Sequence, residues 1–106
     1  MARPRIDPAV TAHVARAAVA TETAARYAKQ LASHFGHKAE IRTEAEGPRI
    51  VLTVGSCLLV PGDHALELRA QSETREGLER VQKVVGSHLE RFGQRDGLAV
   101  EWVDRA

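Results

Sequence analysis

The chain is poor in the residues that mark several functional classes. Only one of its 106 residues is a cysteine, so no internal disulfide can form, and we expect a reducing, cytoplasmic location. Aromatic residues make up 4% of the chain, too few for the stacking platforms that bind single-stranded nucleic acids. The net charge of +1 and the pI near 8.0 lack the basic excess of a nucleic-acid-binding protein. We therefore expect no nucleic-acid partner.

Long apolar runs are also missing. No run approaches the roughly 20 residues that cross a bilayer, and the N-terminus lacks the apolar segment of a signal peptide, so we expect no membrane association. The remaining composition is 43% hydrophobic and 27% charged, which is typical of a soluble protein with one modest core. We expect a disordered tail over residues 1–11 and a single domain over residues 12–106.

Two stretches have the period of an amphipathic helix. The first covers residues 22–35, with Thr21 as the expected N-cap and Gly36 as the residue that ends it. The second begins at Ser72 as N-cap and stops at Gly93. Their expected buried stripes are Ala24, Tyr27, Ala28, Leu31 and Phe35 in the first helix, and Leu78, Val81, Val85, Leu89 and Phe92 in the second.

The remaining segments favour strands. Short runs bounded by turn residues predict strands over residues 12–20, 39–45, 49–54, 57–60, 65–71 and 98–103. Turns are expected at residues 46–48 and 61–63, and Gly55-Ser56 predicts a two-residue hairpin turn in which glycine supplies a positive φ. In the last strand, Leu98, Val100 and Trp102 should face the core. The order β-α-β-β-β-β-α-β predicts an α+β two-layer sandwich, an antiparallel sheet with both helices on one face.

Three ordered motifs resemble a family of small bacterial proteins, the domain of unknown function 2218. The first family pattern is Thr-x-x-Ala-x-Arg-Tyr-x-Lys-Gln-Leu-x-x-His-x-x-His-Lys, which residues 21–38 match at each fixed position. Residues 55–59 match a Gly-x-Cys-x-Leu element, and residues 85–92 match Val-x-x-His-Leu-x-Arg-Phe. The resemblance covers residues 14–103. It departs at residues 93–96, where the family often has a second aromatic residue and an Arg-Glu pair.

The resemblance implies little about activity, because the family has none assigned. Some relatives are similar to segments fused to, or encoded beside, siderophore-interacting flavin reductases. The resemblance therefore suggests an iron or siderophore context and such a reductase as a partner.

Residues 27–38 hold the densest group of chemically capable side chains, including His34 and His37. If Cys57 lies nearby, the three residues offer ligand types suited to zinc or another transition metal. Alternatively, Cys57 is a nucleophile paired with one of these histidines. The structural alternative makes His34 a histidine at the edge of the core, makes His37 a cap for helix carbonyls, and makes Cys57 a small buried residue.

A topological argument addresses the convergence of these residues. If each element reverses the chain direction, Cys57, Glu73 and the end of the first helix share one end of the domain. His88 would then lie toward the other end, together with His64 and Arg91. His88 is expected to pack beside the apolar stripe and to bond a nearby carbonyl. Basic side chains that can receive an anionic ligand are Lys29, Lys38, Arg91 and Arg95.

No complete catalytic constellation is evident in the sequence. The leading hypothesis is therefore a non-enzymatic accessory or ligand-binding domain, linked to iron handling through the resemblance alone. The alternatives are a metal-binding or thiol-dependent enzyme centred on His34, His37 and Cys57, and an oligomerisation or partner-docking module, including a homo-oligomer. Candidate ligand-binding residues are Lys29, His34, His37, Lys38, Cys57, Glu73, His88 and Arg91.

Overall fold

The computed structural model describes residues 13–105 and has the predicted architecture. The predicted tail, residues 1–11, lies outside the described residues. The strands are β1 (His13–Ala20), β2 (Glu40–Glu44), β3 (Gly47–Leu52), β4 (Gly55–Pro61), β5 (Ala65–Ser72) and β6 (Val103–Arg105). The helices are α2 (Ala24–Phe35), α3 (Arg75–Phe92) and the short 3₁₀ helix η1 (Gln94–Asp96).

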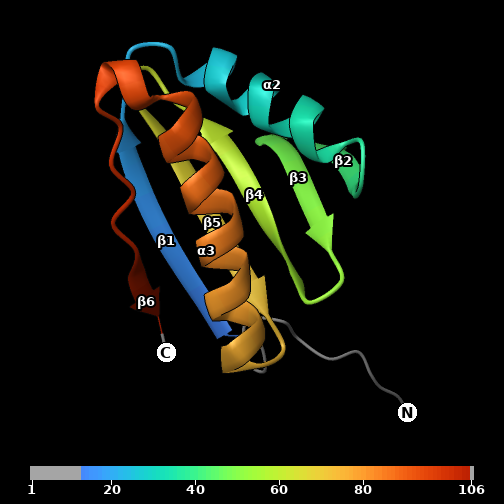
Figure 1. The fold of residues 1–106 in the computed structure, drawn as a ribbon. Coiled ribbons are helices and arrows are strands. Elements are labelled where there is room, and N and C mark those ends of the chain that lie inside the picture. Colours follow the sequence, from blue (N-terminus) through green and yellow to red (C-terminus); the bar gives the residue numbers. More distant parts are fainter. Residues whose placement is uncertain (1–12, 106) are drawn as a thin grey trace.

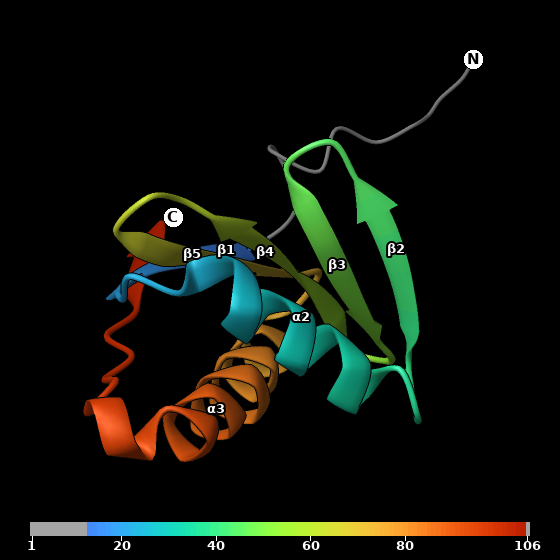
Figure 2. The same cartoon turned by 90° about the horizontal axis from the view of Figure 1, so that it is seen from above.

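The six strands form one antiparallel sheet in the order β2-β3-β4-β5-β1-β6. Both long helices cover the same face, and within residues 13–105 the other face carries no helix (Figures 1 and 2). The two helices differ in direction over the sheet. Helix α3 runs along β4, β5 and β1, whereas α2 crosses the strands and contacts β5, β4, β3 and β2 (Figure 1). This crossing decides which ends of the helices meet.

The core fills the space between the sheet and the helices. All five expected residues of the α2 stripe are buried, as are four of the five in α3, where Phe92 is half-buried. Alternation on the strands supplies the opposite wall, because every second residue of β5 and β1 faces the helices. The largest fully buried side chains are Leu31, Ile50, Leu59, Leu66, Leu68 and Leu89. Within residues 13–105, neither helix is both long and apolar enough to cross a membrane.

The predicted hairpin turn at Gly55-Ser56 is wrong by two residues. The turn is Thr53-Val54, and Gly55 already pairs with Leu52 as the first residue of β4. Gly55 is not among the positive-φ glycines of the described chain. A Cβ at Gly55 would instead lie 2.3 Å from the carbonyl oxygen of Gln71, so this glycine allows two backbones to approach. The earlier turn shifts similarly to residues 45–46, and residues 47–48 begin β3.

Both predicted helix caps also move. Thr74 caps α3, because its Oγ1 accepts a hydrogen bond from the Gly77 amide at 2.9 Å. Ser72 is the last residue of β5, and its hydroxyl donates to the Val54 carbonyl at 2.5 Å. At α2, Thr23 holds the cap position without a side-chain cap bond, and Thr21 Oγ1 accepts from the Thr23 amide at 3.1 Å.

The last predicted strand is shorter and later than expected. Strand β6 covers only Val103–Arg105, and residues 98–102 have no regular secondary structure. Leu98, Val100 and Trp102 still pack against the core, as the alternation predicts. A Cβ on Gly86 of α3 would lie 3.1 Å from Trp102 Nε1, so the indole occupies the space that this glycine leaves. The segment therefore fills the flank of α3 before it reaches β1.

Candidate functional site

The ends of α2 and α3 bring four rings together. We call His34, Phe35, His88 and Phe92 the ring cluster. The His34 ring centroid lies 4.8 Å from that of His88 and 5.3 Å from those of Phe35 and Phe92. His88 lies 5.0 Å from Phe35 and 6.4 Å from Phe92, its i+4 neighbour on the same face of α3. The cluster thus places two imidazoles beside each other against two aromatic rings.

The orientation of His88 is fixed by the backbone. Its Nδ1 lies 2.7 Å from the carbonyl oxygen of Val84, one turn earlier in α3. A carbonyl can only accept a hydrogen bond, so Nδ1 carries the proton. In the neutral ring Nε2 then holds a lone pair and is free of a proton. The predicted bond from His88 to a nearby carbonyl is therefore present.

The ring cluster has basic surroundings. Desolvation is the main cause that lowers the pKa of His34, and the further causes are nearby basic groups. In order of effect these groups are His88, Lys38, His37 and Arg91. His34 also lies in the last turn of α2, where the exposed carbonyls favour a protonated imidazole. These surroundings disfavour a positive charge on His34 in the free protein, and an anion is the ligand that would compensate such a charge.

The prediction that His88 and Arg91 lie far from His34 is wrong. It assumed that α2 reverses direction like a strand, but α2 crosses the strands (Figure 2), and the rings of His34 and Phe35 at its end contact His88 of α3. His64 was expected toward the same end of the domain as His88; its Nδ1 lies 3.0 Å from a Glu22 carboxylate oxygen, just before α2, and it is not one of the four clustered rings. The first and third family motifs thus meet at the ring cluster.

Cys57 does not belong to this cluster. Its side chain is fully buried in the core, and Cys57 pairs with Ile50 of β3 and with Ala70 of β5. Burial raises the pKa of the thiol from 9.0 to about 12, so almost no thiolate exists at neutral pH. Among the described residues, no three histidine, cysteine or acidic side chains are placed to hold a metal ion. The predicted metal site of His34, His37 and Cys57 is therefore not formed.

Two further candidates lie away from the rings. Lys29 is exposed on α2, outside the buried stripe. Glu73 is exposed just before α3, and the thirteen-residue step from Arg75 to His88 spans about 20 Å along a helix. Glu73 does lie near the start of β4, as predicted, because Gly77 approaches Val54 and Gly55 approaches Ser72. Glu73 is therefore remote from His88, and Lys29 is turned away from the core.

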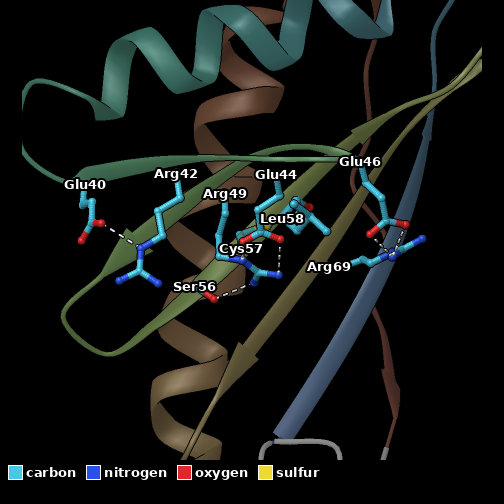
Figure 3. Close-up of polar contacts among 9 residues, drawn as sticks. All are labelled: Glu40, Arg42, Glu44, Glu46, Arg49, Ser56, Cys57, Leu58 and Arg69. Atoms are coloured by element: carbon cyan, nitrogen blue, oxygen red, sulfur yellow. Dashed lines mark hydrogen bonds and ion pairs between the residues drawn. The ribbon is translucent and has the colours of Figure 1, made fainter.

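A second polar cluster covers the helix-free face of the sheet (Figure 3). Strand register places four arginines in one row across the sheet, interrupted by Leu58. In sheet order the row is Arg42, Arg49, Leu58, Arg69 and Arg16. Only alternation along β3 and β5 could have indicated this row in advance, because the residues are far apart in sequence.

Each arginine of the row has a glutamate partner. Arg49 donates from Nε and Nη2 to Glu44 at 2.5 and 3.2 Å, and from Nη1 to Ser56 at 2.9 Å. Arg69 contacts Glu46 at 3.1 Å, which links the β2–β3 turn to β5 (Figure 3). It also contacts Glu67 of β5 at 3.1 Å. The outer two pairs are Arg42 with Glu40 at 2.8 Å and Arg16 with Glu67 at 3.3 Å. Because the charges are compensated, this face lacks the surplus that would attract an anion.

Comparison with known proteins establishes the family. Residues 16–103 match the model of a family described as an uncharacterized protein conserved in bacteria, DUF2218. The chain belongs to this family. The DUF2218 fold also occurs in the NMR structure of PA4090 from Pseudomonas aeruginosa, which is 30% identical and superposes with a TM-score of 0.72. That match covers 86% of this chain and 95% of PA4090.

The DUF2218 match confirms the resemblance, and the likeness to PA4090 confirms the α+β fold. No curated protein matches the chain. The family is uncharacterized, so membership assigns the chain no ligand, metal or activity.

Proposed function

We propose that this protein is a small accessory domain that binds an acidic molecule at the ring cluster. The observation that carries the proposal is the 4.8 Å contact between the His34 and His88 rings, with basic side chains around it. Two imidazoles and two phenyl rings suit a ligand that carries both negative charge and a flat apolar part. A cation would add to the positive charge, whereas an acidic group compensates it.

The siderophore context from the family resemblance fits this chemistry. Catecholate and carboxylate chelators of ferric iron are acidic, and catechols also have an aromatic ring. We therefore propose an acidic iron chelator as the ligand class, and a siderophore-interacting reductase as the protein that receives or supplies it. A cytoplasmic location belongs to the same proposal, since Cys57 is a free thiol. Homo-oligomerisation and partner docking stay predictions.

Binding is assigned in preference to catalysis because of the groups available. The one thiol, Cys57, lies in the core and so supplies no nucleophile to the two imidazoles. A binding role needs only the ring faces and ring nitrogens that can donate a hydrogen bond once they are protonated.

Nuclear magnetic resonance can test the site directly. We would titrate the protein with a gallium(III) tris-catecholate, a diamagnetic substitute for the ferric complex, and follow the imidazole signals. The signals of His34 and His88 should move, while that of His64, which is exposed beside Glu22, should not. His88→Gln should weaken binding at least about tenfold, the effect of losing a charge-assisted hydrogen bond, and His64→Gln is the matched control. Unchanged signals, or equal affinity in both variants, would contradict the proposal.

A further inference from the structure

The tautomer of His88 has a consequence for any anion that reaches it. Its Nδ1 proton is already donated to Val84, so the nitrogen available to a ligand is Nε2. In the neutral ring this nitrogen is an acceptor, and it repels the lone pairs of an oxyanion. An anion can accept a hydrogen bond from Nε2 only after that nitrogen has taken up a proton. Binding and protonation at His88 are thus the same event.

In the free protein, a positive charge on the His34 ring would have only basic groups as charged neighbours. His34 faces His88 from α2, and its charged neighbours are His37 and Lys38 from the segment after α2 and Arg91 from α3. The other rings in contact, Phe35 and Phe92, carry no charge. Every titratable group that acts on His34 is therefore basic, and added positive charge has no acidic partner among them. An oxyanion between the imidazoles supplies that partner.

We propose that the ring cluster is a proton-coupled site for a multivalent oxyanion, in which His34 and His88 bind the ligand as imidazolium ions. This inference rests on the proposed function and names the ligand chemistry of the same site. The protons balance as follows: the ligand brings two or more negative charges, solvent supplies one proton to His88 Nε2 and one to His34, and the release of the ligand returns both protons. The two imidazolium ions, Lys38 and Arg91 together carry more positive charge than a monoanion can compensate. The charge of the ligand therefore sets the selectivity.

The coupling predicts a specific dependence on pH. The pKa of His34 lies below its ordinary value of 6.5, so above that pH the free ring is neutral and binding as an imidazolium ion takes up a proton from solvent. Each proton taken up makes the association constant fall by about tenfold per pH unit in that range. Affinity should therefore be highest in mild acid and fall steeply toward about pH 8.

Isothermal titration calorimetry can measure the proton directly. We would titrate the full chain with inorganic phosphate, citrate and acetate at about pH 7.5 in two buffers of different ionisation enthalpy. We expect phosphate or citrate to bind with net proton uptake between about 0.5 and 2 per ligand, since both imidazoles can contribute. Acetate, a monoanion, should bind at least about tenfold more weakly. Phosphate binding without citrate binding would identify phosphate esters as the source of the oxyanion, and the reverse would identify polycarboxylates.

Variants separate the proton from the fold. In His88→Gln the pH dependence and most of the proton uptake should be lost, and in His64→Gln both should persist. If His88→Gln does not fold, the two-buffer measurement on the unmodified chain still decides the question. Binding of these anions without proton uptake, or without binding preference over acetate, would overturn this inference and leave the proposed function standing. Failure of the gallium catecholate as well as the oxyanions to bind would overturn both.

Discussion

Labelling of Cys57 with a thiol reagent separates a structural cysteine from a nucleophile. The perturbation is 5,5′-dithiobis(2-nitrobenzoate), which reacts with the thiolate and releases a coloured product. Cys57 is fully buried, and its thiol pKa is raised from 9.0 to about 12. The native protein should therefore react very slowly, and the unfolded chain should react at the ordinary rate.

The size of the effect follows from the shifted pKa. A rise from 9.0 to about 12 lowers the thiolate fraction at pH 8 by about 1000-fold, from about one in ten to about one in ten thousand. Burial adds a steric block, because the reagent must wait for the core to open. We therefore expect native labelling to be at least about 1000-fold slower than labelling of the unfolded chain.

The assay compares the absorbance of released thionitrobenzoate with and without concentrated guanidinium chloride. Because the chain has one cysteine, Cys57→Ala should release nothing and serves as the control. A native rate within about tenfold of the unfolded rate would show an accessible, ionised thiol. That result would refute the structural role of Cys57 and restore the thiol-dependent enzyme as a candidate.

Two stability predictions concern the other polar groups. Arg49→Lys should lower the free energy of unfolding by about 1 kcal/mol in urea denaturation, because lysine cannot bond Glu44 in bidentate geometry and also reach buried Ser56. The control is Arg42→Lys, on an exposed pair, which should change the free energy of unfolding by less than about 0.5 kcal/mol. Equal losses in the two variants would contradict the role given to Arg49. For His34 the folded pKa lies below the unfolded value of 6.5, so the unfolded state binds more protons and stability falls as the pH drops below 6.5 through the folded pKa. Urea midpoints at neutral and mildly acidic pH should therefore converge in His34→Gln, and an unchanged acid loss in that variant would argue against the basic surroundings of the ring.

The fold was largely predictable because its signals are local. Helical spacing of apolar residues defined α2 and α3, and Gly36 and Gly93 mark their ends. Alternation in β5 predicted which residues face the helices. The wrong predictions concern residues whose side chains bond a partner that is distant in the sequence. Ser72 resembles a helix cap, but its hydroxyl bonds the Val54 carbonyl across the hairpin, which only the folded chain brings near.

Gly55 illustrates the same limit from the backbone side. A glycine followed by serine between two apolar runs predicts a tight turn through its access to positive φ. The actual requirement is the 2.3 Å approach that a Cβ would make to the Gln71 carbonyl, on a strand sixteen positions later in the chain. The residue type was informative, but its physical reason depends on tertiary packing.

The place where the candidate site forms depends on the angle at which α2 crosses the strands, and no local sequence signal gives that angle. Strand parity predicts at which end of the domain Cys57 lies. The structure also places Cys57 on the face of the sheet that the helices cover. The positions of His34 and His88 depend on how α2 lies over the strands, which is set by the packing of Leu31 and Phe35 into the sheet. A helix antiparallel to α3, the arrangement that strand-like reversal predicts, would have carried His34 toward Glu73 at the start of α3. Because α2 crosses instead, His34 meets His88 and Arg91, and the same residues form a basic site that suits an anion rather than a metal.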